Sequence, residues 1–108
     1  MSTVTVIFMA SKMSRACDIS PKVRKEVIDR DRVCIICGRY SGLQVAHYIS
    51  RARGGLGTAK NLGLMCVECH GQYDNSHRHK EIKTMFEEYL KSHYEDWNED
   101  DLIYRKWR

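Results

Sequence analysis

Four of the five cysteines form two pairs whose spacing is typical of metal binding. Cys34 and Cys37 are separated by two residues, as are Cys66 and Cys69, and 28 residues lie between the pairs. Two such pairs supply the four thiolates that a structural Zn²⁺ binds in tetrahedral geometry. A site closed by four protein ligands leaves no position for a substrate, so the sequence predicts a zinc ion that stabilises the fold. The less favoured alternative is four buried free cysteines.

A second group of side chains could hold a catalytic metal. His70 and Asp74 are four residues apart and share one face of a predicted helix. His70 could also replace Cys69 as a zinc ligand, but neighbouring residues on a helix point about 100° apart, so both cannot face the zinc. An imidazole and a carboxylate on one face can bind Mg²⁺ or Mn²⁺. From these two residues alone, an unliganded pair on a helix surface is the better interpretation.

Three helices are predicted to position these groups. The first begins at Ser20, which can cap it, with Pro21 in its first turn. Its basic residues, Arg30 among them, fit either a solvated face or phosphate contacts. The second helix begins within residues 67–75, and the third covers residues 79–97. The apolar stripes that they would bury are Val23, Val27 and Ile28 in the first helix, and Ile82, Met85, Phe86, Tyr89, Leu90 and Tyr94 in the last.

The region between the cysteine pairs is predicted to hold a hairpin and a glycine-rich loop. Residues 43–49 mix β-branched and aromatic residues over the length of a strand, and residues 38–42 are typical of a turn. His47 lies in this strand, where a histidine is ordinarily part of the packing. Residues 50–61 contain three glycines, which would let a ligand approach the backbone, and three cations that could bind phosphate; a flexible turn is the alternative. These cations are Arg51, Arg53 and Lys60.

Length and composition indicate one small domain. We expect residues 1–19 to be a poorly ordered lead-in and residues 20–108 to form the domain, with its core at about 33–76 and a tail that docks back after the last helix. Residues 1–80 carry 13 Lys and Arg against 6 Asp and Glu, so a polyanion would bind this part. The sequence has no apolar run of membrane-spanning length and no convincing signal peptide, so we expect a cytoplasmic protein.

The order of these motifs resembles the HNH endonuclease family, the ββα-metal nucleases, in its four-cysteine zinc form. The segments that carry the resemblance are CIIC at 34–37, AHYI at 46–49, RARGG at 51–55, NLGLMCVECH at 61–70, and Asp74. The chain is especially similar to small HNH proteins of bacteriophages and prophages, including in the ending DWNEDDLIYRKW. The resemblance covers nearly all of the chain after about Cys17. It implies an α+β fold with a zinc-stapled ββα-metal core and flanking N-terminal and C-terminal helices.

The resemblance also implies roles for individual residues. His47 matches the general base that takes a proton from the attacking water, and Asn61 matches the residue that holds the loop and orients this base. His70 and Asp74 match positions that face a catalytic divalent ion, Mg²⁺ or Mn²⁺. A neutral imidazole suits proton abstraction near pH 7, and a divalent ion stabilises the departing 3′ oxygen. The expected reaction is hydrolysis of DNA that leaves a 5′ phosphate.

The position before His47 departs from the family pattern. The family usually has Asp or His there as a further metal ligand, whereas this chain has Ala46, whose methyl group cannot coordinate. The ion would then be held by His70, Asp74, phosphate and water, or a ligand would come from elsewhere in the chain, since Mg²⁺ ordinarily keeps several waters. Alternatively, His47 is itself the ligand and another group is the base.

These observations predict a divalent-metal-dependent DNA endonuclease. One alternative is a zinc-stapled DNA-binding accessory module that has lost catalysis. Another is a nuclease that cuts only with a partner, such as a phage terminase or another packaging protein. The presence of His47, Asn61, His70 and Asp74 together favours the enzyme, because a binding module has no use for all four.

Overall fold

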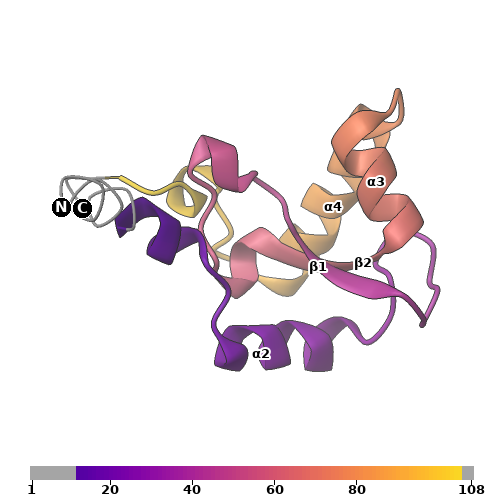
Figure 1. Ribbon diagram of the computed structural model, residues 1–108, viewed down its shortest axis with the longest axis horizontal. Helices are drawn as coiled ribbons and strands as arrows, with labels where there is room; N and C mark the ends of the chain where they lie inside the picture. Colours follow the sequence, from indigo (N-terminus) through magenta and orange to yellow (C-terminus); the bar gives the residue numbers. More distant parts are fainter. Residues whose placement is uncertain (1–11, 106–108) are drawn as a thin grey trace, which may run out of the picture.

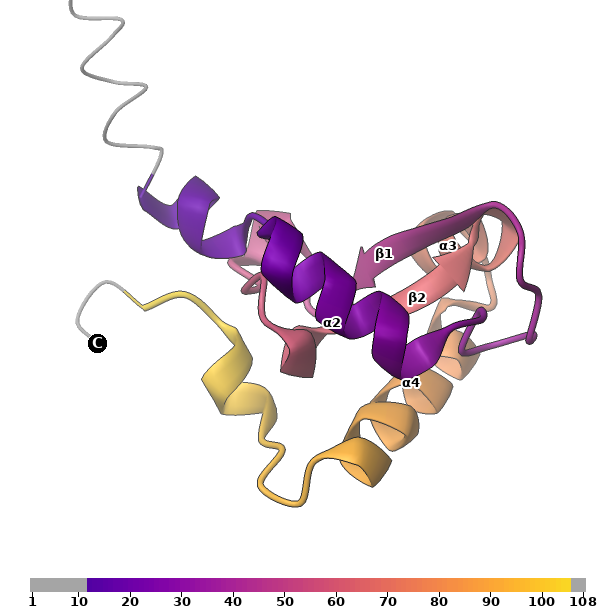
Figure 2. The same ribbon diagram turned by 90° about the horizontal axis from the view of Figure 1, so that it is seen from below.

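The computed structural model describes residues 12–105, which form an α+β domain with two layers of helix around a small sheet. In chain order the elements are α2 (Pro21–Asp31), β1 (Leu43–His47), the 3₁₀ turns η1 (Arg51–Arg53) and η2 (Ala59–Asn61), β2 (Leu62–Cys66), α3 (Val67–Asn75), α4 (His79–His93) and the 3₁₀ helix η3 (Glu99–Leu102). Figure 1 shows α2 on one face of the sheet and α3 and α4 on the other. Figure 2 views the molecule from the side of α2, with the strands behind it. The predicted α+β class and ββα core are confirmed.

The sheet consists of two antiparallel strands joined by the glycine-rich loop. Leu43 of β1 lies opposite Cys66 of β2, and His47 lies opposite Leu62. All five residues of β2 are buried because helices cover both faces of the sheet. The prediction that residues 38–42 form the turn of a hairpin was wrong. These residues connect the first cysteine pair to β1, and the strand that pairs with β1 is β2.

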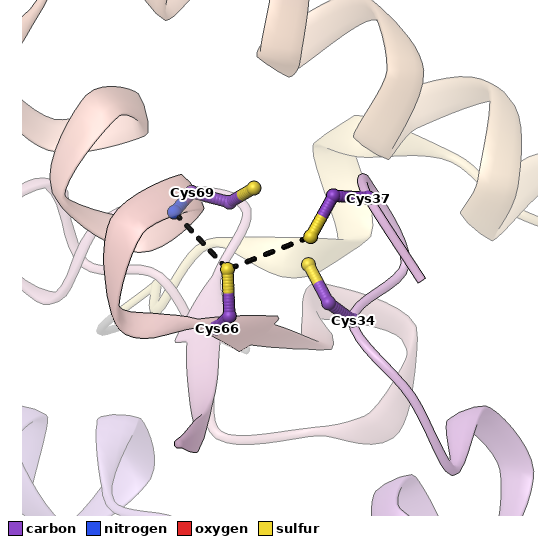
Figure 3. A group of neighbouring side chains, drawn as sticks. All are labelled: Cys34, Cys37, Cys66 and Cys69. Atoms are coloured by element: carbon purple, nitrogen blue, oxygen red, sulfur yellow. Dashed lines mark hydrogen bonds between the residues drawn. The ribbon is translucent and has the colours of Figure 1, made fainter. Parts of the chain in front are cut away.

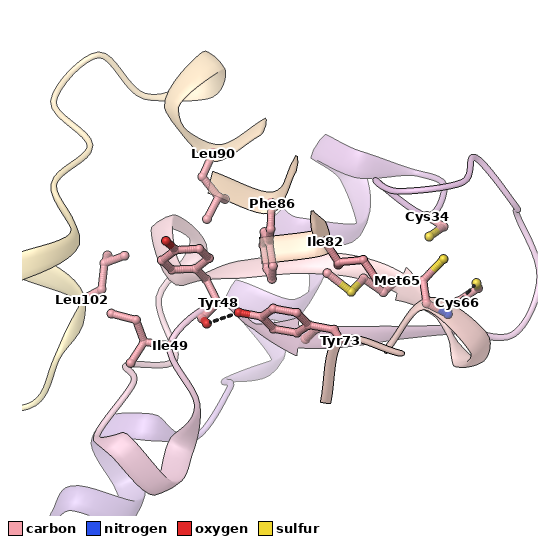
Figure 4. Close-up of a cluster of buried hydrophobic side chains, with 12 residues drawn as sticks. Cys34, Tyr48, Ile49, Met65, Cys66, Tyr73, Ile82, Phe86, Leu90 and Leu102 are labelled. Carbon is pink, nitrogen blue, oxygen red and sulfur yellow. Dashed lines mark hydrogen bonds between the residues drawn. The ribbon is translucent and has the colours of Figure 1, made fainter. Parts of the chain in front are cut away.

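The larger hydrophobic cluster lies between the sheet and α4. Phe86 has no exposed surface and packs edge to face against Tyr48 and Tyr73, with ring centroids 5.4 and 5.7 Å away. Figure 4 shows these rings gathered in the space between α4 and the strands. Gly63 of β2 lies directly under Phe86, because a Cβ there would be 2.6 Å from the ring. The ring therefore rests on backbone, which brings α4 close to the sheet.

The predicted helices are present, but their apolar stripes are narrower than expected. In α4 the predicted stripe is buried at Ile82, Phe86 and Leu90. Met85 is 37% exposed and Ile28 of α2 is 45% exposed, so neither belongs to the core. The last helix also ends at His93 and not at residue 97. One row of α4 residues is fully buried, while Tyr89 beside it is partly buried and packs against the same cluster.

A buried ion pair joins α2 to the sheet and to α4. Arg30 donates hydrogen bonds to Asp31, to backbone carbonyls of η2 and β2, and to the hydroxyl of Tyr94. Asp31 also accepts from the Leu64 N–H at 2.9 Å and from the Tyr89 hydroxyl. The interpretation of Arg30 as part of a solvated or phosphate-binding face was therefore wrong, because its side chain is used inside the fold.

Both ends of the described chain contact the glycine-rich loop. Residues 12–17 of the predicted lead-in are helical, and residues 1–11 lie outside the described range. The Gly57 N–H donates to the Ala16 carbonyl at 3.0 Å. At the other end, Leu102 is buried and its carbonyl accepts from Leu56 N–H at 2.8 Å. Within residues 12–105, no helix combines the length and apolar character needed to cross a bilayer.

Candidate functional site

The four paired cysteines meet at one end of the sheet. Cys34 and Cys37 lie on the loop after α2, Cys66 ends β2, and Cys69 lies in the first turn of α3 (Figure 3). Their sulfur atoms all lie within 4.8 Å of one another, and the sulfurs of Cys37 and Cys66 are 3.6 Å apart. Tetrahedral Zn–S bonds of about 2.3 Å place sulfurs about 3.8 Å apart. The predicted metal-binding group is therefore confirmed in its residues, and its thiolates fit a structural zinc ion.

Backbone hydrogen bonds hold this cluster in place. The Ile35 N–H donates to the Leu64 carbonyl at 2.9 Å, which ties the first cysteine pair to β2. Gly38 has a φ of 81°, which lets the chain turn so that its N–H reaches the Cys34 carbonyl. Burial opposes ionisation of Cys34, but backbone N–H groups around its sulfur outweigh burial and lower its pKa to about 7. This environment favours the thiolate form of Cys34, whereas burial and hydrogen bonds with the other cysteines raise the pKa of the Cys69 thiol.

A cavity of about 740 Å³ brings several of the predicted site residues together. His47 reaches it from β1, and His70 and Asp74 reach it from α3. Arg24 of α2 and Arg51 of η1 also line it. A potential base, two potential metal ligands and two cations thus share one open space.

His47 is oriented by a backbone carbonyl. Its Nε2 lies 2.9 Å from the carbonyl oxygen of Cys17. Because a carbonyl only accepts hydrogen bonds, Nε2 carries the proton of the neutral ring and Nδ1 keeps a free lone pair. Burial lowers the pKa of His47 below its ordinary value, and the positive charge of Arg51 acts in the same direction. The ring is therefore neutral at pH 7, with one nitrogen able to accept a proton.

His70 and Asp74 place a nitrogen and an oxygen side by side. His70 Nδ1 lies 2.7 Å from Gln44 Oε1, and His70 Nε2 lies 3.6 Å from Asp74 Oδ2. If Nδ1 donates to the amide oxygen of Gln44, the lone pair of Nε2 is free beside the carboxylate, as a metal site requires. Within residues 12–105, only the four cysteines form a group of three or more His, Cys, Asp or Glu close enough to hold a metal. His70 and Asp74 alone therefore offer two ligands, an incomplete set.

Asn61 lies behind the cavity and connects the loop to the strand. It has no exposed surface, and its Oδ1 accepts from the Ile49 N–H at 2.8 Å. Its Nδ2 donates to the carbonyls of Ile49 and Leu56, at 3.1 and 2.8 Å. These bonds fix the chain two residues after His47. The side chain itself does not line the cavity.

Comparison with protein families gives a match to the segment that contains these groups. Residues 34–76 match the family model for HNH endonuclease. This segment is therefore similar to HNH endonucleases. It spans both cysteine pairs as well as His47, Asn61, His70 and Asp74. Comparison with curated proteins found no match. The family that this model describes is one of metal-dependent nucleases that act on nucleic acid.

Two of the three cations predicted to bind DNA line the cavities around His47. Arg51 lines the larger cavity, where its guanidinium is 2.7 Å from the carboxylate of Asp18. Arg53 lines a neighbouring cavity of about 230 Å³. Lys60 lines neither of these cavities, and its Nζ is 2.6 Å from the carboxylate of Asp96. The structure therefore does not bring Lys60 to the site.

The glycines of the loop make room for the protein's own backbone. A Cβ at Gly55 would lie 1.6 Å from the Ile49 carbonyl oxygen, and one at Gly57 would lie 2.0 Å from that of Asp18. Gly54 has a φ of 84°, which allows the chain to turn after η1. The interpretation that Gly55 and Gly57 let a ligand approach the backbone was wrong, because another part of the chain already fills the space beside these two glycines.

Position 46 contributes to the core of the domain. Ala46 has no exposed surface and belongs to the cluster between the sheet and α4, whereas its neighbours Val45 and His47 line the larger cavity. The methyl group supplies no ligand there.

Two residues at this site were not predicted from the sequence. Gln44 contacts His70, and its only signal was a polar side chain in an otherwise apolar strand. Asp18 lines the larger cavity from a segment that was expected to be poorly ordered. No local pattern marked Asp18, because its position depends on how residues 12–19 pack against the loop.

Proposed function

We propose that the protein is a divalent-metal-dependent DNA endonuclease in which His47 is the general base. One observation carries the proposal: His47 shares a cavity with His70 and Asp74, and its Nε2 is occupied by a backbone carbonyl. The free Nδ1 is then the only ring nitrogen that can take a proton. A histidine that served only as packing would need no such cavity or ligand pair.

In the proposed reaction, His47 Nδ1 removes a proton from a water molecule whose oxygen attacks the phosphorus. A new P–O bond forms, and the bond from phosphorus to the 3′ oxygen breaks with its electron pair on that oxygen. The 3′ oxygen then takes a proton from solvent, which leaves a 5′ phosphate and a 3′ hydroxyl. A divalent ion bound by His70 and Asp74, Mg²⁺ or Mn²⁺, would stabilise the negative charge on the leaving oxygen.

Other residues would prepare this step. Asn61 is a positioning residue, because its buried amide holds the chain next to His47 against the loop. Arg51 would bind phosphate once the phosphate replaces Asp18 as its partner, and Arg24 faces the same space. Phosphate and water would complete the metal coordination that His70 and Asp74 begin, which suits Mg²⁺ because it ordinarily retains several waters.

The proposal can be tested with supercoiled plasmid. Wild-type protein should nick or linearise the plasmid with Mg²⁺ or Mn²⁺ and not with a chelator. His47→Ala should lower the rate roughly 10²- to 10⁴-fold, the usual contribution of a general base. His77→Ala is the matched control, because His77 lines neither cavity. Equal survival of plasmid with wild type and His47→Ala, in every metal tried, would favour the DNA-binding module instead.

The resemblance to phage proteins supports a role in phage DNA processing or packaging, in the cytoplasm of an infected bacterium. Copurification of tagged protein with a terminase from infected cells would support this setting. Recovery of the tagged protein without any packaging protein would contradict it.

A further inference from the structure

The cavity around His47 continues into a second one on the side of α4. This smaller cavity, of about 230 Å³, shares His47, Ser50 and Asp74 with the larger one. It adds Arg53 from η1 and Lys83 from α4. Because the two cavities have common walls, a group bound in one lies next to a group bound in the other.

The two cations of the smaller cavity have no carboxylate partner within residues 12–105. In this part of the chain the Arg53 guanidinium makes no hydrogen bond or ion pair, and Lys83 Nζ lies 5.6 Å from the centre of the Tyr48 ring. Arg51 and Lys60, in contrast, each pair with an aspartate, at 2.7 and 2.6 Å. The cavity therefore has two cations and one carboxylate, that of Asp74, which forms an ion pair with neither of them. This surplus of positive charge is suited to an anion from outside the chain.

Tyr73 and His79 form the wall between these cations, and several contacts hold them in place. Tyr73 is buried and its hydroxyl donates to the Tyr48 carbonyl. The His79 ring stacks on Tyr73, with centroids 4.9 Å apart and an angle of 12° between the planes. His79 Nδ1 also contacts the Tyr73 carbonyl oxygen. The start of α4 is therefore fixed against α3, and Lys83, one turn later, has a defined place beside the cavity.

We propose that Arg53 and Lys83 bind the phosphate next to the scissile one, so that the DNA strand runs from α2 across His47 to the start of α4. This inference rests on the proposed function and extends it. Arg24 would contact the strand on the α2 side of the larger cavity, and Arg53 and Lys83 would contact it on the α4 side. Phosphate contacts of this kind position a strand without reading its base sequence.

The test measures DNA binding in a His47→Ala background, so that cleavage does not interfere. Fluorescence anisotropy of a short labelled duplex gives the dissociation constant between about 50 and 200 mM salt, the range over which counterion release is pronounced. Adding Arg53→Ala and Lys83→Ala should weaken binding and reduce the slope of log affinity against log salt by about 2, one for each cation that no longer neutralises a phosphate charge. The charge-matched control adds Lys22→Ala and Lys25→Ala, which are exposed on α2 outside both cavities. Circular dichroism and zinc content check that both proteins are folded.

The outcomes separate this inference from the proposed endonuclease. A slope that falls only in the Arg53/Lys83 protein supports the phosphate site, even if wild type cuts no DNA in any metal, in which case the endonuclease proposal fails alone. If wild type cuts DNA but the Arg53/Lys83 protein binds like the Lys22/Lys25 control, the phosphate site is overturned alone. Absence of DNA binding by the His47→Ala protein itself would overturn both.

Discussion

The cysteine cluster and the cavity beside it both depend on α3, but they differ in how complete they are. The four sulfurs already lie within 4.8 Å of one another. In the cavity, His70 Nε2 and Asp74 Oδ2 are 3.6 Å apart, and their side chains are 26% and 55% exposed. A structural ion needs all its positions filled by the protein, whereas a catalytic ion must leave positions for substrate and water. The fold therefore brings all four sulfurs of the cysteine cluster together, whereas the proposed catalytic site has two protein ligands and leaves its other positions to phosphate and water.

The first turn of α3 also connects the cysteine cluster to the cavity. The Cys66 sulfur accepts from the Cys69 N–H at 3.4 Å and so caps the start of α3, and His70 follows directly. An ion bound by the cysteines would fix the first turn of this helix. A metal ion bound by the cysteines would therefore help to determine the direction in which His70 points.

Removal of one predicted zinc ligand should have the largest effect, and it tests whether the fold depends on metal binding by the cysteine cluster. We expect Cys69→Ser to bind zinc weakly and to unfold at ambient temperature, because structural zinc sites of small domains contribute on the order of 10 kcal/mol. Circular dichroism and metal analysis measure this. Cys17→Ser is the matched control, since Cys17 is buried outside the cluster. A folded, zinc-free Cys69→Ser protein would contradict the prediction.

Asn61→Ala should loosen the cavity while the cysteine end keeps its metal. The change removes the partners of the Ile49 N–H and of two carbonyls, which costs roughly 1–3 kcal/mol for each buried group left unpaired. Denaturant unfolding measures the decrease in stability, and metal analysis should still find zinc bound. Unchanged stability, or release of zinc together with a fall in activity, would show that the two regions are not separable in this way.

The pH dependence of cleavage should reveal the neutral base. Because burial lowers the pKa of His47, kcat/KM should be level near pH 7 and fall about tenfold per pH unit only at pH values below the ordinary histidine pKa of about 6.5. The unfolded chain binds the proton more readily there, so this residue's contribution to stability also declines as pH falls through that window. If kcat/KM already falls to half of its plateau at a pH above the ordinary histidine pKa, the assignment of His47 as the base is contradicted.

Gln44→Ala should have the smallest effect, and it tests whether Gln44 orients the His70 ring for metal binding. Without the Gln44 oxygen, the His70 ring can rotate, and the affinity for Mn²⁺ should fall about tenfold. Calorimetric titration of Mn²⁺ into zinc-loaded protein measures it. Gln44→Glu keeps an acceptor at this place and should retain the affinity. Equal Mn²⁺ affinity in wild type and Gln44→Ala would remove Gln44 from the site.

Elements with a local signal could be predicted from the sequence. Ser20 caps α2 as expected, accepting from the Val23 N–H at 3.1 Å, and the spacing of the cysteines predicted a cluster that the structure confirms. The stripe of α4 was predicted at the positions that face the sheet, although Met85 at its edge is exposed. Each of these features is determined by a few neighbouring residues.

Features that depend on distant parts of the chain could not be predicted. The partner strand of β1 is chosen by packing between two helical layers, which no hairpin turn specified. Arg30 looked like a surface cation because, apart from the neighbouring Asp31, its partners lie 29 to 64 residues away. The pairing of Lys60 could not be predicted either, because Asp96 lies 36 residues away. The glycines of the loop gave a signal, but close approach to a ligand and close approach to the protein's own backbone look the same in a sequence.

The hydrogen bond between His47 and residue 17 has a consequence for how related proteins are recognised. The acceptor is a main-chain carbonyl that lies before the matched segment 34–76, so any amino acid at position 17 could provide it. A family signature records side chains and therefore passes over this contact. Homologues with unrelated leading residues can orient the corresponding histidine in the same manner. A transplanted segment 34–76 would carry the whole signature and lack the carbonyl that holds the ring of its histidine.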